Sequence, residues 1–271
     1  MVTLKHLFTN IYLLFFINGL LVASVIYFKT EDTYESELFI SIVNKINENH
    51  IAEKNADSFF IKAMDMANYL QHYRADVFAD DDIAGWKAKL FHSTTVDLMT
   101  GQGSCGTASV ILARILKSYN YQVRFAQMKV GNTWGGHIIV EVKKHEGWIV
   151  LDPLFRVFFT KPDGKLASFN DVHSNWEYYK QQVPKDYPMQ YNYEDVRYTN
   201  WDKIPVVGNI SKRILNLTLG KEKANEISIR SYLLRNYHLL FVITLILFII
   251  TAVYTFFSFM KQRKIIQPPY L

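Results

Sequence analysis

Two long apolar blocks, one near each end of the chain, constrain its fold more than any other feature. The first covers residues 11–28 (IYLLFFINGLLVASVIYF) and contains no charged side chain. Extended back to residue 7, it can cross a hydrocarbon core of about 30 Å at about 1.5 Å per residue. The second covers residues 239–260 and also lacks charge. We therefore expect transmembrane helices at residues 7–28 and 239–260.

A cleaved signal peptide is the alternative interpretation of the first block. The apolar part of a signal peptide is about 7–15 residues long and is followed by a cleavage site with small residues. The block here is longer and ends in the bulky residues Ile26, Tyr27 and Phe28. These features favour a permanent membrane anchor.

The charges beside the two blocks predict the orientation in the membrane. Positive residues near a span prefer the cytoplasmic side. Lys5 precedes the first block, and Lys261 and Lys264 follow the second, whereas Arg230 and Arg235 favour the opposite orientation. We expect both termini in the cytoplasm and the middle of the chain outside it, in a plasma or inner membrane.

The segment between the blocks has the composition of a globular domain. The whole chain is 49% hydrophobic with a net charge of +5, which excludes a disordered polymer. Its Lys and Arg residues are scattered, so no nucleic-acid partner is expected. The lone cysteine excludes an intramolecular disulfide. We expect a helical part at residues 31–100 with helices at 34–49 and 57–77, a core with an aromatic-rich wrap at 101–208, and an amphipathic juxtamembrane segment at 209–236.

An aspartate run at residues 80–82 allows two interpretations. A calcium site needs a loop of oxygen ligands, and no such pattern follows the run. Carboxylates are stabilised at helix N-termini, so we expect a turn leading into a helix at residues 83–92 instead. The spacing of His and Cys also lacks a metal-ligand pattern, and neither a metal nor a cofactor is expected.

The segment most informative about chemistry is residues 101–159. It opens with a Gly-rich entry, GQGSCG, and continues as an amphipathic helix, which places Ser104 or Cys105 at the helix N-terminus. The free N–H groups and the dipole at that end lower the pKa of a thiol. A strand at 121–129 follows, and then a hairpin whose strands are opened by His137 and ended by Asp152, which brings these two side chains side by side. This order of elements predicts an α+β domain.

These motifs resemble the transglutaminase-like superfamily, a branch of the papain-like cysteine-peptidase architecture. The shared pattern is a nucleophile in G-x-C at a helix start, then His-φ-φ-V-E-V, then G-W-φ-φ-φ-D-P. The resemblance implies a transglutaminase-like domain between two transmembrane helices, with Cys105 as nucleophile, His137 as general base and Asp152 as the residue orienting that base. Animal transglutaminases carry a Trp directly after the nucleophile, where this chain has Gly106.

The chemistry of the three residues favours the same roles. A thiolate attacks a carbonyl, an imidazole exchanges the proton, and a third group fixes the imidazole. Each residue also has a structural interpretation: Cys105 as a small buried hydrophobe, His137 as a strand-end histidine, and Asp152 as a strand terminator. An amide oxygen can also accept the ring N–H, so Asp152→Asn is expected to keep substantial activity.

Two neighbours are candidates for the oxyanion site or the cleft. Gln102 can donate its amide N–H to an oxyanion beside the Cys105 backbone N–H, or be solvated in its loop. Trp134 precedes His137 by three residues and can wall the cleft, donate its indole N–H, or pack at the rim.

The chain beyond residue 159 is rich in aromatics. Tyr187, Tyr191 and Tyr193 belong to a stretch that can line a substrate groove, lie at the headgroup level, or pack on the domain's own core. The further elements expected here are a hairpin around residues 163–164, a helix at 171–182 and an amphipathic helix at 210–229.

The sequence thus predicts a membrane-anchored cysteine enzyme acting on an amide or peptide carbonyl through a thioester, by hydrolysis or acyl transfer, in the cell envelope. Its partners would be a protein or peptide substrate and the lipid bilayer. The alternative is a catalytically silent copy of the fold, serving as a binding or assembly module for an envelope or surface-polysaccharide system.

Overall fold

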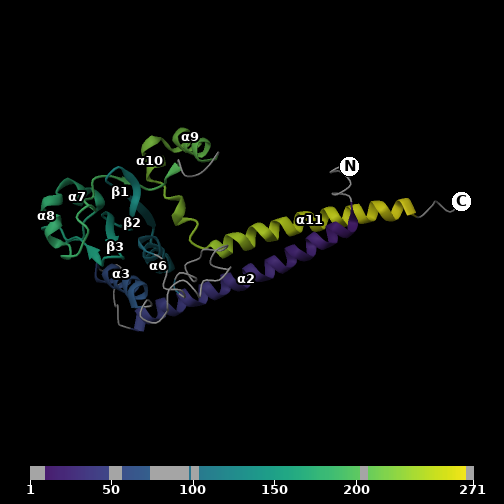
Figure 1. The fold of residues 1–271 in the computed structure, drawn as a ribbon, viewed down its shortest axis with the longest axis horizontal. Helices are drawn as coiled ribbons and strands as arrows, with labels where there is room; N and C mark the ends of the chain where they lie inside the picture. Colours follow the sequence, from purple (N-terminus) through teal and green to yellow (C-terminus); the bar gives the residue numbers. More distant parts are fainter. Residues whose placement is uncertain (1–9, 49–56, 74–97, 99–103, 202–206, 267–271) are drawn as a thin grey trace. The chain divides into compact units, whose positions relative to one another are not determined.

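The computed structural model describes residues 10–48, 57–73, 98, 104–201 and 207–266 (Figure 1). The chain divides into two compact units: Met1–Glu37 with Arg235–Leu271, and Leu38–Leu234. The helix expected at residues 83–92 and the aspartate run before it lie outside the described residues.

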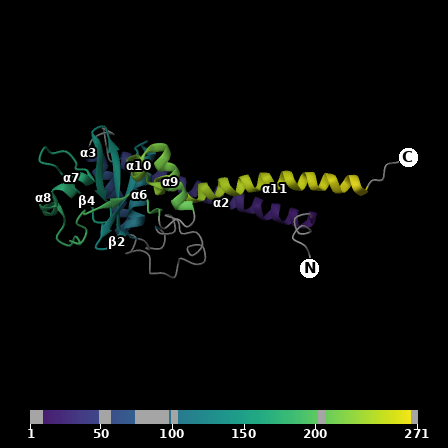
Figure 2. The ribbon, with the colours of Figure 1, turned by 90° about the horizontal axis from the view of Figure 1, so that it is seen from above.

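The first unit is built from α11 (Asn236–Ile266) and from the part of α2 (Ile11–Glu48) up to Glu37, which lie side by side in Figures 1 and 2. Both are long and apolar enough to cross a membrane, as the sequence predicts. The separate helix expected at residues 34–49 is wrong, because α2 continues through that region without a break. Residues 29–33 contain no Gly or Pro, and the hydroxyl of Thr33 bonds back to the Lys29 carbonyl within the helix.

Polar side chains join the two apolar helices in the first unit. Asn18 of α2 donates to the Thr255 hydroxyl of α11 at 2.8 Å and accepts from the Thr251 hydroxyl at 2.9 Å. Nearer the start of α11, the buried carboxylate of Asp32 accepts hydrogen bonds from the Arg235 guanidinium, the shortest at 2.6 Å. An apolar environment offers such groups no water, so hydrogen bonds between the helices satisfy them.

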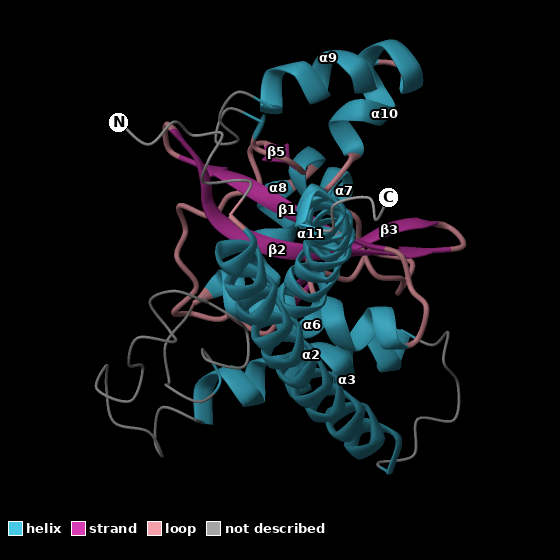
Figure 3. Cartoon of the chain, turned by 90° about the vertical axis from the view of Figure 1, so that its right-hand side faces the viewer, coloured by secondary structure: helices cyan, strands magenta, loops and turns pink. Residues whose placement is uncertain are grey.

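The second unit is built on an antiparallel sheet, with strand order β4-β3-β2-β1-β5. Figure 3 labels β1, β2, β3 and β5 of this sheet. The mixed helix-and-sheet architecture is therefore confirmed. Consecutive strands from β1 to β4 are neighbours because short turns connect them. The strands are β1 (Val123–Val130), β2 (Thr133–Lys144), β3 (Gly147–Asp152), β4 (Val157–Phe158) and β5 (Val196–Arg197).

Helices or loops cover both faces of the sheet, and β2 accordingly has buried apolar side chains on each face. Val140 and Val142 belong to a first core with α3 (Asp57–His72) and α6 (Cys105–Ser118). Ile139 belongs to a second core with α7 (Phe169–Ser174) and α8 (Trp176–Tyr179). Aromatic side chains of residues 187–193, which we call the wrap, complete this core. Figure 2 shows α6 on one side of the sheet and α7 and α8 on the other.

Two helices expected from periodicity are broken in the structure. The helix expected at 171–182 is replaced by α7, α8 and a 3-10 turn, Lys180–Gln182, because Asn175 is non-helical at φ −144°, ψ 52°. The amphipathic helix expected at 210–229 is split at Gly220, whose φ of +83° ends one helix and starts the next. The resulting elements are α9 (Val207–Leu219), α10 (Lys221–Glu226) and a 3-10 turn at Ile229–Ser231.

Candidate active site

Cys105 is the first residue of α6, as the amphipathic pattern predicts. The helix is held from behind by fully buried side chains such as Ile111 and Leu112, while the thiol itself is partly exposed. The first N–H groups of a helix have no carbonyl partner within it, so they are available to a negative charge on the sulfur or on a bound oxyanion.

His137 lies inside β2 rather than at its start, which corrects the sequence prediction. The strand begins at Thr133, directly after a tight turn in which Gly131 has φ +57°. The pairing of β1 with β2 shifts between Met128 and Lys129, so the strand carries an irregularity just before His137. Such an irregularity re-aims the following side chain.

Two glycines make this irregularity possible. Gly135 adopts φ +74°, a left-handed conformation that side chains disfavour. A Cβ on Gly136 would lie 2.7 Å from the Cβ of Val130 on the neighbouring strand. The Gly-Gly pair is therefore what lets the strand bring His137 to its buried position.

Asp152 ends β3 and holds the His137 ring. Its Oδ2 atom lies 2.6 Å from Nε2 of His137, and both side chains are almost completely buried. Its Oδ1 atom accepts the backbone N–H groups of Leu154 and Phe155, at 3.1 and 3.3 Å. Asn68 of α3 donates to the Leu154 carbonyl at 2.9 Å and fixes this turn from the other side. Asp152 thus uses both oxygens as acceptors.

The electrostatics join Cys105 to His137. Burial by itself raises the pKa of the Cys105 thiol, but the interaction with the neighbouring His137 and its charge outweighs burial, so the pKa of the thiol is lowered. Burial likewise lowers the pKa of His137, but Asp152 and Cys105 outweigh it and raise that pKa to about 9. Both shifts favour a thiolate–imidazolium pair at neutral pH.

The ring nitrogen left for the sulfur is Nδ1, because Nε2 is taken by Asp152. Nδ1 of His137 is buried and forms no hydrogen bond of ordinary geometry with any described residue. The thiol therefore interacts with it at longer range or at a poorer angle, as is common in enzymes without substrate. One turn along α6, the Ser109 hydroxyl donates to the Ile138 carbonyl at 2.9 Å and ties the helix of the thiol to the strand of the imidazole.

Aromatic side chains from the wrap cover the His–Asp pair. Tyr191 stacks on the His137 ring, with centroids 4.3 Å apart and the planes 1° from parallel. The hydroxyl of Tyr187 lies 3.3 Å from Oδ2 of Asp152, and burial raises the pKa of that phenol well above its usual range, so it stays a donor. Phe155 packs edge-on against both tyrosines. The sequence indicated an aromatic-rich segment without assigning Tyr187 or Tyr191 to the site.

The two accessory candidates have different outcomes. Gln102 lies outside the described residues, so its oxyanion role stays a prediction. Trp134 lies in β2, and the Arg197 guanidinium of β5 sits 3.9 Å over its ring. This cation–π contact places Trp134 at the β5 side of the sheet, in agreement with the packing alternative.

Gly106, where animal transglutaminases carry Trp, has a close neighbour of its own. A Cβ on Gly106 would lie 3.2 Å from Nη2 of Arg230, and that nitrogen also lies 3.5 Å from the Gly106 carbonyl oxygen. A large aromatic side chain at this position would displace the arginine.

Chemically, the arrangement couples a thiol with a lowered pKa to an imidazole that a buried carboxylate holds, which are the groups that nucleophilic catalysis requires. Among the described residues, no group of three or more His, Cys, Asp or Glu side chains is arranged to hold a metal ion. No protein-family model, curated protein or solved structure matches the chain.

Proposed function

We propose that the protein is a membrane-anchored, transglutaminase-like cysteine enzyme that acts on an amide or peptide carbonyl through a thioester. The observation that carries this proposal is the buried 2.6 Å contact between His137 and Asp152 beside a thiol whose pKa His137 lowers. A purely structural role requires no such coupling of three ionisable groups. Perturbed pKa values that cluster in this way are typical of functional sites.

The reaction begins with attack of the Cys105 thiolate on the carbonyl carbon. The C=O double bond opens to an oxyanion, which the N–H groups at the start of α6 stabilise. His137 gives its proton to the leaving nitrogen, the C–N bond breaks, and a thioester remains. A water molecule or an amine then attacks the thioester and passes its proton back to His137 as the thiolate leaves. Water as acceptor gives hydrolysis, and an amine gives acyl transfer.

The membrane setting supports a substrate in the cell envelope. Both α2 and α11 can cross a bilayer, and the positive residues Lys261 and Lys264 favour a cytoplasmic C-terminus. The domain between the spans then lies outside the cytoplasm, where its partners are envelope-linked proteins or peptides. A reporter fused after Leu271 tests this orientation: reporter activity in the cytoplasm supports it, and external activity overturns it.

Alkylation of the full-length protein in detergent tests the enzyme proposal without a known substrate. Cys105 is the lone cysteine, so iodoacetamide incorporation reports this thiol alone. We expect it to react at pH 7 about ten times faster than glutathione, because the lowered pKa of Cys105 increases the fraction of thiolate. His137→Ala should abolish the excess rate, and His145→Ala, at an exposed turn, should not.

The same experiment distinguishes the alternative function. A Cys105 that reacts no faster than glutathione would overturn the enzyme proposal and favour a silent binding or assembly module. Cys105→Ala should leave the melting temperature nearly unchanged, within about 1 kcal/mol of unfolding free energy, since the thiol is partly exposed. Activity-based profiling of membranes with wild type and Cys105→Ala then identifies the substrate.

A further inference from the structure

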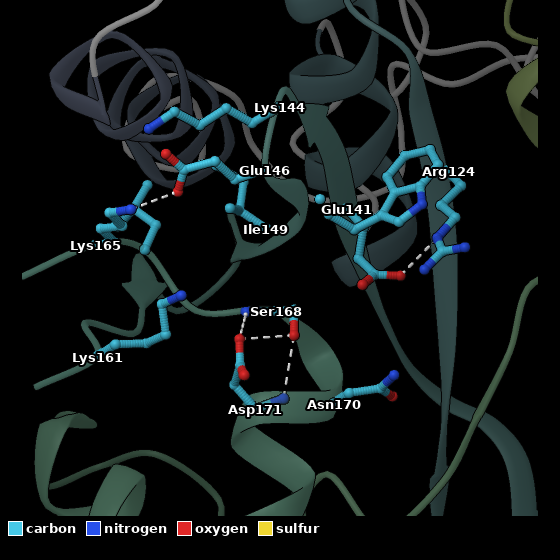
Figure 4. A pocket seen from close by; sticks show the side chains of 13 residues that line it. Arg124, Glu141, Lys144, Glu146, Ile149, Lys161, Lys165, Ser168, Asn170 and Asp171 are labelled. Atoms are coloured by element: carbon cyan, nitrogen blue, oxygen red, sulfur yellow. Dashed lines mark hydrogen bonds and ion pairs between the residues drawn. The ribbon is translucent and has the colours of Figure 1, made fainter. Parts of the chain in front are cut away.

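A polar pocket lies on the second unit, away from Cys105, at the end of the sheet where β2 turns into β3. It has a cavity volume of about 330 Å³, in the range of small-molecule sites. Its walls come from β1, from the β2–β3 hairpin, and from the turn and helix that follow β4 (Figure 4). The residues that matter for its chemistry are Arg124, Glu141, Lys161, Lys165, Asn170 and Asp171.

The pocket is built around a rigid arginine. Arg124 is only 8% exposed, and its guanidinium is held between the rings of Trp148 and Tyr198, at 4.1 and 3.8 Å. Its Nε donates to Glu141 at 2.8 Å, directly across the β1–β2 pair. Stacking and pairing fix the plane of the guanidinium before any ligand arrives, which lowers the entropic cost of binding.

The acceptors of the pocket are already occupied. Glu141 accepts from Arg124, and Glu146 accepts from Lys165 at 2.8 Å. Asp171 accepts from the hydroxyl and the backbone N–H of Ser168 in a capping box (Figure 4). The three carboxylates in the lining thus already have donors.

The donors of the pocket are not all occupied. Nη1 of Arg124 is buried and forms an ion pair with Glu226 at 3.5 Å. Nε donates to Glu141, so Nη2 is the guanidinium nitrogen without a partner among the described residues. The side chains of Lys161 and Asn170 form no hydrogen bond or ion pair with the described residues, and in Figure 4 Lys161 lies across the hollow from Arg124. The lining also carries one more cationic than acidic side chain. A ligand with acceptor atoms would bind favourably here, because it would satisfy hydrogen-bond donors that have no partner in the described part of the protein.

We propose that this pocket binds a small soluble oxyanion, a carboxylate or a phosphate, between Arg124, Lys161 and Asn170. Arg124 offers Nη2 as a charged donor in a fixed orientation, and Lys161 adds a second charge at the rim. Cys105 is not part of this site, so a test of anion binding does not depend on whether the protein is a cysteine enzyme. A ligand seated here bridges β1, the turn after β4 and α7.

Isothermal titration of the full-length protein in detergent, at pH 7 and low salt, tests this site. The probes are inorganic phosphate and succinate, with glucose as the neutral probe. We expect saturable binding of at least one anion and none of glucose. Lys161→Gln should weaken that binding by about ten-fold, because it removes a charge-assisted hydrogen bond.

Two further variants separate a built site from general surface charge. Lys185→Gln removes an exposed charge outside the lining and should leave anion binding unchanged. Asn170→Asp places a carboxylate in the lining and should weaken binding at least as much as Lys161→Gln. Both positions lie at the surface, so unchanged melting temperatures show that the fold is intact. Absence of saturable anion binding, or equal weakening by Lys161→Gln and Lys185→Gln, would overturn the proposal.

Discussion

Oδ2 of Asp152 lies 2.6 Å from Nε2 of His137, while Oδ1 of the same carboxylate accepts two backbone N–H groups of the following turn. One side chain therefore fixes both the imidazole and the turn after β3. Because both oxygens accept hydrogen bonds, a side chain with a single acceptor oxygen cannot make all the contacts of Asp152.

Asp152→Asn should lose most of the excess alkylation rate of Cys105, contrary to the expectation from sequence. An amide has a single acceptor oxygen, so either the His137 N–H or the two backbone N–H groups face an NH₂ donor. A buried unsatisfied group costs about 1–3 kcal/mol, so the melting temperature should fall as well. Asp186→Asn, at an exposed position, is the control. Near wild-type alkylation in the Asp152→Asn variant would show that one acceptor is sufficient.

The midpoint of the alkylation rate against pH should lie below 9.0, the ordinary pKa of the thiol, because His137 lowers the pKa of Cys105. His137, with its pKa raised to about 9, stays protonated through neutral pH and supports the thiolate there. In His137→Ala this support is gone while burial still raises the pKa of the Cys105 thiol, so the midpoint should move upward. Rates measured from pH 5 to pH 10 for both proteins check this. Identical midpoints would mean that the two groups are not coupled.

Gly136→Ala should destabilise the domain and slow alkylation together. The added Cβ meets the Cβ of Val130 at 2.7 Å, so the strand must shift just before His137. Overpacking of this kind costs about 1–3 kcal/mol. Gly19→Ala, where a Cβ meets nothing within 4 Å, is the control. Thermal unfolding and alkylation of both variants are the measurements. An unchanged melting temperature and alkylation rate in Gly136→Ala would show that the strand has room for a Cβ at this position.

Asn18→Leu should weaken the association of α2 with α11. It removes the hydrogen bonds to Thr251 and Thr255, and such bonds contribute about 0.6–2 kcal/mol in membranes. Ser24→Ala is the matched control, because the Ser24 hydroxyl bonds only to its own helix, at the Leu20 carbonyl. Denaturant unfolding in detergent compares the two, and equal stability would show that the hydrogen bonds of Asn18 do not hold the helices together.

Local patterns in the sequence predicted the apolar helices, the position of Cys105 at a helix start, and the hairpin that ends at Asp152. These features depend on the period of apolar residues and on nearby turn residues, so a short window of chain contains the information. Helix breaks were less predictable. The continuity of α2 and the interruption at Asn175 depend on single-residue conformations that periodicity does not report.

Tertiary structure alone decided what surrounds those residues. Tyr187 and Tyr191 reach the His137–Asp152 pair from more than thirty residues along the chain, and the anion pocket joins β1 to the start of α7. Periodicity shows that a face is buried, but which distant segment covers it depends on packing between surfaces that no short window contains. The same limit applies to Asp152. The sequence predicted that it lies beside His137, but the hydrogen bonds that both of its oxygens accept depend on the folded turn.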